Sequence, residues 1–94
     1  MTVRECIENQ DFLENIDLDY GRFACIRIGF TDDKGRDDET EFDIDLKEML
    51  KDKGQELYDL FDAFCEENGF RSDRVEWIEI ITQAHSEEEL KKIS

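Results

Sequence analysis

The chain has 94 residues, of which 27 are Asp or Glu and 12 are Lys or Arg, so its formal net charge at pH 7 is −15. This length is typical of one domain, and we expect residues 1–94 to form a single acidic unit. The charge disfavours direct binding to nucleic acids and to anionic membrane surfaces, which select clustered Lys and Arg. It also keeps a chain soluble and favours a monomer.

The three cysteines, Cys6, Cys25 and Cys65, are an odd number with no close spacing. Charged residues follow Met1 almost at once, which is unlike a secretory signal, and no apolar run approaches the ~18 residues of a membrane span. We therefore expect free thiols in a cytoplasmic protein. Seven Phe and one Trp supply large side chains for a core, so the chain is expected to fold despite its charge.

The N-terminal residues 2–16 are expected to form a helix. Thr2 followed by Glu5 fits a capping box, in which each side chain accepts a hydrogen bond from the other residue's backbone. Val3 and Ile7 begin an apolar side that the later residues continue imperfectly, so a break near residue 9 stays open.

A β-hairpin is expected next. Residues 22–30 are apolar on most of both faces, which is typical of a central strand. Residues 31–39 supply a turn in which Gly35 can adopt positive φ. Residues 40–45 then alternate apolar and acidic side chains, as expected for a strand with one wet face.

Residues 46–68 carry one broad apolar stripe with helical spacing. Asp45 is the expected N-cap, and Gly69 is the expected stop in the left-handed conformation. Gly54 interrupts the stripe and predicts either a kink or a division into two shorter helices.

Residues 75–82 are the expected third strand, and Ser86 with Glu89 predicts a capped helix over 87–93. The fold class is therefore α+β, in the order α-β-β-α-β-α. Because the hairpin is antiparallel and one helix returns the chain, we expect a three-stranded antiparallel sheet in the order 2-1-3. The 46–68 helix should pack on one face, which is formed by Ile26, Ile28, Phe42, Ile44, Ile78 and Ile80.

Trp77 is expected on the opposite face of the sheet. Phe23, Val75 and Ile81 should join it in an apolar cluster, because they share its side of their strands. The N-terminal helix is the favoured cover, since monomers rarely leave such patches bare, and a partner protein is the alternative.

Arg27 should lie on this same face, at the centre of the sheet. Glu41 or Asp43 flanks it on one side and Glu79 flanks it on the other. We therefore expect a cross-strand ion pair.

Motifs for metal binding or catalysis are weak. The acidic stretches 15–26 and 37–48 have the length of a calcium loop, but neither combines Gly at its sixth position with Glu at its twelfth. His85 is the only histidine, and one His with scattered Cys does not make a four-ligand zinc site without carboxylates. A Cys25–His85 nucleophile pair would need a contact that spacing does not indicate. We expect no cofactor and no enzymatic activity.

Residues 37–45 contain six carboxylates and no base. Alternate side chains of a strand lie ~6.5–7 Å apart on one face, so Glu39, Glu41 and Asp43 should form an acidic ridge. Such a ridge suits a basic surface on another protein, including a groove that normally holds phosphates. We therefore expect a protein-interaction module, with a nucleic-acid-mimicking inhibitor as its sharpest form. The alternative is a small enzyme or metal-dependent protein that uses His85 and nearby carboxylates. The expected partner-binding residues are Asp37, Asp38, Glu39, Glu41, Asp43 and Trp77.

Overall fold

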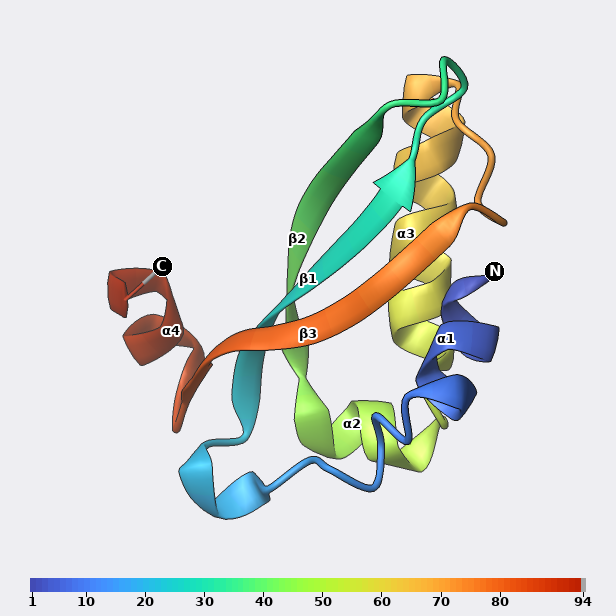
Figure 1. Cartoon of the computed structure of the whole chain (residues 1–94). Coiled ribbons are helices and arrows are strands. Elements are labelled where there is room, and N and C mark those ends of the chain that lie inside the picture. The colour runs from blue at the N-terminus through green and yellow to red at the C-terminus, as the bar shows by residue number, and fades with distance from the viewer. Residues whose placement is uncertain (94) are drawn as a thin grey trace.

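A three-stranded antiparallel sheet with the strand order β2-β1-β3 organises the molecule, as Figure 1 shows. The computed structural model describes residues 1–93. Among these residues, no helix combines the length and apolarity that crossing a membrane requires. In chain order the elements are α1 (Val3–Asn9), the 3-10 helix η1 (Leu18–Tyr20), β1 (Phe23–Thr31), β2 (Asp37–Asp45), α2 (Leu46–Lys51), α3 (Gln55–Asn68), β3 (Val75–Ala84) and α4 (Glu87–Ile93).

The sheet order and the α+β class predicted from the sequence are confirmed. The central strand β1 pairs with β2 from Phe23↔Asp45 to Thr31↔Asp37, so β2 begins three residues earlier than the expected 40–45. Acidic residues are poor strand formers, but pairing with β1 extends β2 through them. The turn between the two strands has Gly35 at φ 79°, as its sequence predicted.

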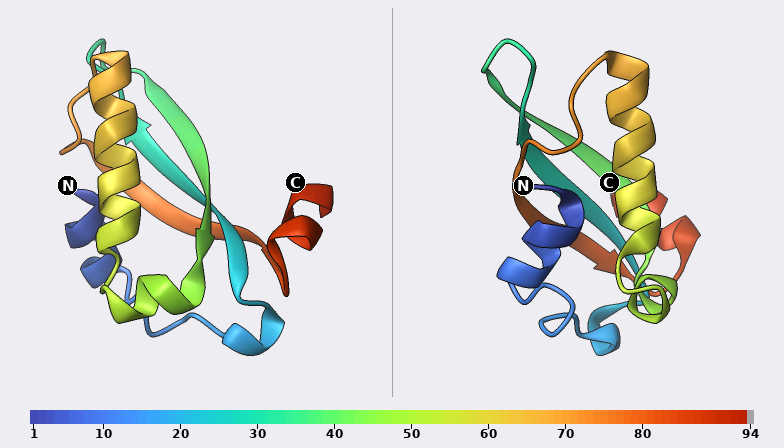
Figure 2. Two further views of the ribbon diagram at one scale, coloured as in Figure 1. Left: turned by 180° about the vertical axis from the view of Figure 1, so that it is seen from behind. Right: turned by 90° about the vertical axis from the view of Figure 1, so that its right-hand side faces the viewer.

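One face of the sheet packs on α3, as Figure 2 shows from two further sides, and this face carries the core. Ala24, Ile26, Ile28 and Phe30 of β1 are at most 1% exposed. Phe30 contacts three other rings edge-on or tilted, with centroids 5.6–5.8 Å apart. These contacts come from Phe61, Phe64 and Phe70.

The expected 46–68 helix is two helices, α2 and α3. The chain turns between them because Lys53 and Gly54 both have positive φ, at 59° and 87°. A Cβ at Gly54 would lie 2.6 Å from Cδ1 of Ile7, so glycine also lets α1 approach closely. The return direction of β3 is unaffected by this division, and Asp45 and Gly69 cap the two outer ends as predicted.

α1 ends at Asn9, well before the expected residue 16, because Asp11 adopts φ 50° and turns the chain. Its capping box between Thr2 and Glu5 is present. The buried residues of α1 join the core beside α3. The prediction that this helix covers Trp77 is therefore wrong.

α4 packs on the other face of the sheet, at the end away from the hairpin turn. Leu90 is 2% exposed and forms a second small core with Cys25, Ala84 and Phe23. The Ser86 hydroxyl accepts a hydrogen bond from the Glu89 amide, as the predicted cap requires. The short terminal helix thus covers one end of a face that was expected to lie under α1.

β3 is longer than predicted and contains two irregularities in its pairing with β1, at Cys25/Ile26 and at Gly29/Phe30. A bulge adds one residue and reverses the alternation of side chains. Val75 therefore lies in the α3 core at 2% exposure, whereas Ile81 is 39% exposed. The predicted cluster of Trp77 with Phe23, Val75 and Ile81 is not formed.

Candidate functional site

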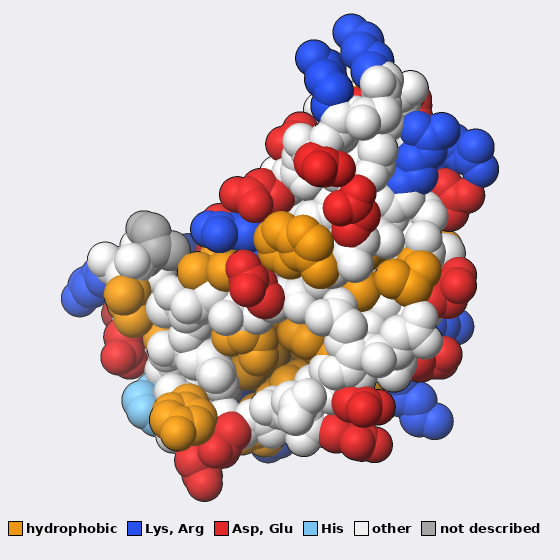
Figure 3. Space-filling view, in the orientation of Figure 1, with side chains coloured by type: hydrophobic (Ala, Val, Ile, Leu, Met, Phe, Trp, Pro, Cys, Tyr) orange, Lys and Arg blue, Asp and Glu red, His pale blue; other side chains and the backbone are white. Residues whose placement is uncertain are grey.

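The sheet face opposite α3, which we call the outer face, carries the acidic side chains of β2. Four acidic residues of β2 pair with those residues of β1 that alternate with its core residues, so their side chains lie on the outer face. They are Asp37, Glu39, Glu41 and Asp43. Glu79 of β3 stands opposite Arg27 on the same face. Figure 3 views the molecule from this face, where acidic side chains lie around apolar ones and Lys and Arg side chains lie at the upper end. The expected acidic row is thus solvent-exposed.

At the hairpin end, the outer face has a shallow pocket of 240 Å³. Four of the six residues predicted to bind a partner line it, together with one that the sequence analysis missed. The lining residues are Asp37, Asp38, Glu39, Glu76 and Trp77.

Trp77 reaches this pocket because its cross-strand neighbour on β1 is Gly29. A Cβ built on Gly29 would lie 2.1 Å from Cε2 and 2.2 Å from Nε1 of Trp77, so the indole occupies the space that any other side chain would fill. The ring lies over Gly29 of the central strand and is half-buried. Gly29 thereby brings the tryptophan of β3 next to the carboxylates of β2.

Two carboxyl groups meet beside the indole. A side-chain hydrogen bond with Glu76, reinforced by the charge of that carboxylate, raises the pKa of Asp37. Thr31 donates its hydroxyl hydrogen bond to Glu76 from the end of β1. The neighbouring carboxylate of Glu76 therefore opposes the ionisation of Asp37 at the rim of the pocket.

Arg27 is the basic residue at the centre of the outer face. Its Nη2 lies 3.4 Å from Oε2 of Glu41, and its Nε lies 3.8 Å from Oε1 of Glu39. The predicted cross-strand ion pair is therefore confirmed with Glu41 on the β2 side, and Glu39 is a further partner. Within residues 1–93, Arg27 forms no ion pair with Glu79, the partner expected on the β3 side. One guanidinium offsets part of the charge of two carboxylates, so the row stays net negative.

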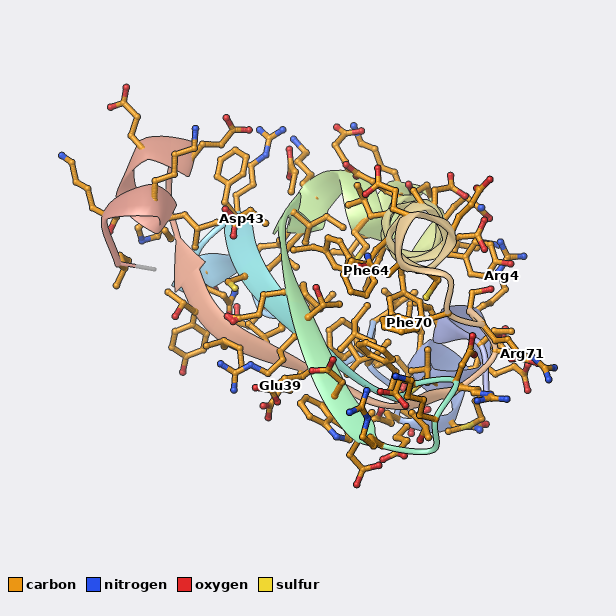
Figure 4. All side chains as sticks on the ribbon, turned by 90° about the horizontal axis from the view of Figure 1, so that it is seen from above. Arg4, Glu39, Asp43, Phe64, Phe70 and Arg71 are labelled. Carbon is orange, nitrogen blue, oxygen red and sulfur yellow. The ribbon has the colours of Figure 1, made fainter. Side chains whose placement is uncertain are left out.

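Asp43 lies at the end of the acidic row nearer α4, on the same face of β2 as Glu39. Figure 4 labels both residues and shows them apart along the strand. Asp43 lines a second pocket, of 280 Å³, between the end of β2, the start of α3 and α4. Its apolar walls come from Phe23, Ile44 and Leu90, and its charged residues are Asp43, Asp45, Glu56, Glu87 and Lys91. The predicted row therefore runs from the pocket at the hairpin end to this second pocket.

This second pocket is also strongly acidic. Burial raises the pKa of Glu56, and the nearby carboxylates of Asp52, Asp45 and Glu48 raise it further. Arg22 holds Asp45 by a 2.7 Å ion pair, and the pKa of Asp45 is lowered mainly by this hydrogen bond. The sequence pattern gave no signal for Glu56 or Glu87 in this pocket, because only the packing of α4 near β2 brings them together.

The alternative site around His85 is not assembled into a cluster. His85 is exposed, and its backbone amide donates a 3.3 Å hydrogen bond to Glu89. Among residues 1–93, no group of three His, Cys, Asp or Glu side chains is placed to hold a metal ion. Cys25 is buried under α4, where burial first and the carboxylate of Glu41 second raise the pKa of its thiol to about 11. A nucleophilic cysteine requires a shift in the opposite direction.

No protein-family model, no curated protein and no solved structure matches this chain.

Proposed function

We propose that this protein is an acidic interaction module that docks on a basic surface of another protein. The observation that carries the proposal is the outer face of the sheet, where β2 presents exposed carboxylates beside the half-buried indole of Trp77. Carboxylates of this density raise the association rate with a basic partner, and an aromatic residue supplies contact area at the centre of an interface.

The sharpest form of the proposal is an inhibitor that mimics the charge of a nucleic acid. The carboxylates of β2 form one row of negative charge along the outer face, and Glu76 and Glu79 of β3 add further negative charge beside it. A groove that binds phosphates would meet these carboxylates with Lys and Arg. Such a partner would lose its nucleic acid when it binds this chain, which makes competition with a DNA duplex the distinguishing measurement.

The experiment begins with the full chain immobilised as bait in an extract of its source cell, followed by elution with rising salt. The eluted partner is then purified, and its association and dissociation rates are measured at several salt concentrations. We expect the association rate to fall most steeply with salt, because charge steering acts mainly on that rate.

A pair of matched variants locates the surface. Glu39→Gln, Glu41→Gln and Asp43→Asn together remove three charges from β2, and we expect them to weaken binding with the fold retained. The control removes three charges from exposed positions on α3, by Asp59→Asn, Asp62→Asn and Glu66→Gln. Equal losses in both variants would show that only net charge matters and would refute docking through the outer face. If neither variant loses affinity, the carboxylates are not the contact, and Trp77→Ala tests the indole.

A further inference from the structure

The two edges of the sheet differ in whether other residues bind their outward-pointing backbone groups. On the edge of β3 that faces away from β1, the Ile78 amide donates a 3.1 Å hydrogen bond to Oε1 of Gln10, and Nε2 of Gln10 donates a 3.4 Å bond to the Ile78 carbonyl. The Val75 amide donates a 2.8 Å bond to the carbonyl of Met1. The residues around α1 thus occupy backbone groups of β3 that another strand would otherwise pair with.

Within residues 1–93, no side chain or terminal segment pairs with the edge of β2 in this way. Hydrogen bonds at both ends of the hairpin, from Asp32 to Arg36 and from Leu46 to Arg22, show that even-numbered residues of β2 pair with β1. The amides and carbonyls of the odd-numbered residues therefore point away from the sheet. The Asp38 carboxylate accepts the Glu39 amide. Within the described chain, the amides of Glu41 and Asp43 have no backbone partner.

The outward-pointing backbone groups belong to acidic residues, which defines what can pair with them. A second copy of β2 would bring six carboxylates against six, so self-pairing is opposed by like charge. On a fourth strand, residues opposite Glu39, Glu41 and Asp43 would place their side chains on the outer face, next to these carboxylates. Lysine or arginine at alternate positions satisfies that register.

The residues between those bases would face the α3 side of the sheet. There they would lie beside Thr40 and Phe42, and Phe42 packs edge-on against Phe64 with ring centroids 6.2 Å apart. All three residues are only partly buried, so an apolar side chain gains contact there. The same edge leads at its C-terminal end into the acidic pocket by α4, whose apolar wall and carboxylates suit one long basic side chain.

We propose that β2 accepts an extended segment of a partner protein as a fourth strand, with basic residues alternating with apolar ones. This inference rests on the proposed docking function and specifies its partner: the basic surface is a strand-forming segment. Backbone hydrogen bonds to β2 supply affinity, and the carboxylates select the alternating bases.

The test uses the full chain and a synthetic peptide of about ten residues that alternates lysine and valine, a length that covers β2. Its control has the same sequence with N-methyl groups on the amides that would face β2, which removes the hydrogen bonds and keeps the charge. We expect the unmodified peptide to bind at low salt and the methylated one to bind at least about tenfold more weakly. In amide-resolved hydrogen exchange, Glu41 and Asp43 should become protected only with the unmodified peptide.

Two variants of the protein separate backbone pairing from charge. Glu41→Pro removes an outward amide and a carboxylate, whereas Glu41→Gln removes the carboxylate alone. Proline is tolerated on an edge strand where its nitrogen faces solvent, so we expect the proline variant to bind the peptide far more weakly than the glutamine variant. If the proline variant fails to fold, the methylated peptide still decides the question on the unaltered protein.

The outcomes distinguish this inference from the function on which it rests. Equal binding of the two peptides, without protection of Glu41 and Asp43, would overturn strand addition and leave docking by charge intact. Absence of binding by both peptides at low salt would also overturn strand addition. Docking through the outer face fails if the two triple-charge variants lose the same affinity for the captured partner, or if neither of them nor Trp77→Ala weakens binding.

Discussion

The contact between Gly29 and Trp77 can be tested by one added methyl group. In Gly29→Ala, the new Cβ would lie 2.1 Å from Cε2 of Trp77, well inside the 3.0 Å below which such contacts essentially never occur. The indole must therefore leave its place over β1, or the strands must separate. Overpacking of this kind costs ~1–3 kcal/mol in unfolding free energy. For a domain of this size each kcal/mol lowers the melting temperature by ~4–8 °C.

The control is the same substitution in a Trp77→Ala background, where the space is free. Glycine in a strand is ~0.5–1 kcal/mol less stable than alanine, so Gly29→Ala should be neutral or stabilising there. The cycle of four proteins should thus give a coupling of ~1–3 kcal/mol by chemical denaturation. Trp77 is the only tryptophan, and its emission in Gly29→Ala should shift to the red as the ring becomes more exposed. Equal destabilisation in both backgrounds would refute the contact, because the loss of unfolding free energy would then come from the backbone of β1.

Three further predictions concern charge. The hydrogen bond with Glu76 raises the pKa of Asp37. This bond therefore stabilises the fold at low pH, and its contribution is lost as pH rises through the raised pKa of Asp37. Asp37→Asn imitates the protonated form, so its melting temperature should exceed that of the wild type at pH 7 and converge with it near pH 3; a constant difference would contradict the pairing. Arg27→Ala should lower the free energy of unfolding by ~0.2–1 kcal/mol at low salt and by less at high salt, since the ion pairs of Arg27 are partly exposed. The control, Lys34→Ala at the exposed hairpin tip, should leave the free energy of unfolding unchanged. The wild-type melting temperature should rise between 0.01 and 0.1 M sodium chloride, as the Debye length falls from ~30 to ~10 Å, and a flat curve would mean that local pairs already compensate the charge.

Local patterns in the sequence were sufficient to predict most of the elements. The alternation in β2, the apolar β1 and the capping residues Thr2, Asp45 and Gly69 each act over a few neighbouring residues, and each is present in the structure. The strand order followed from these elements, because a two-sided apolar strand is most stable between two others. The exposed carboxylates of β2 were visible for the same reason.

What the sequence could not determine depends on contacts between distant segments. The bulges in β3 moved Val75 into the core and Ile81 to the surface, and a bulge is set by pairing with β1 rather than by its own residues. The place of α1 depended on Gly54, which lets Ile7 approach the turn between α2 and α3.

The candidate surface also depends partly on local sequence patterns and partly on contacts between distant segments. Its carboxylates could be predicted from the period of a strand, but their arrangement could not. Glu76 met Asp37 because β1 holds their strands in register, and Asp43 met Glu56 and Glu87 because α3 and α4 pack near the end of β2. Local spacing determines which side chains share a strand face, because that period is a property of the backbone. Only the packed structure determines which of them meet, because register, twist and cover arise from the whole sheet.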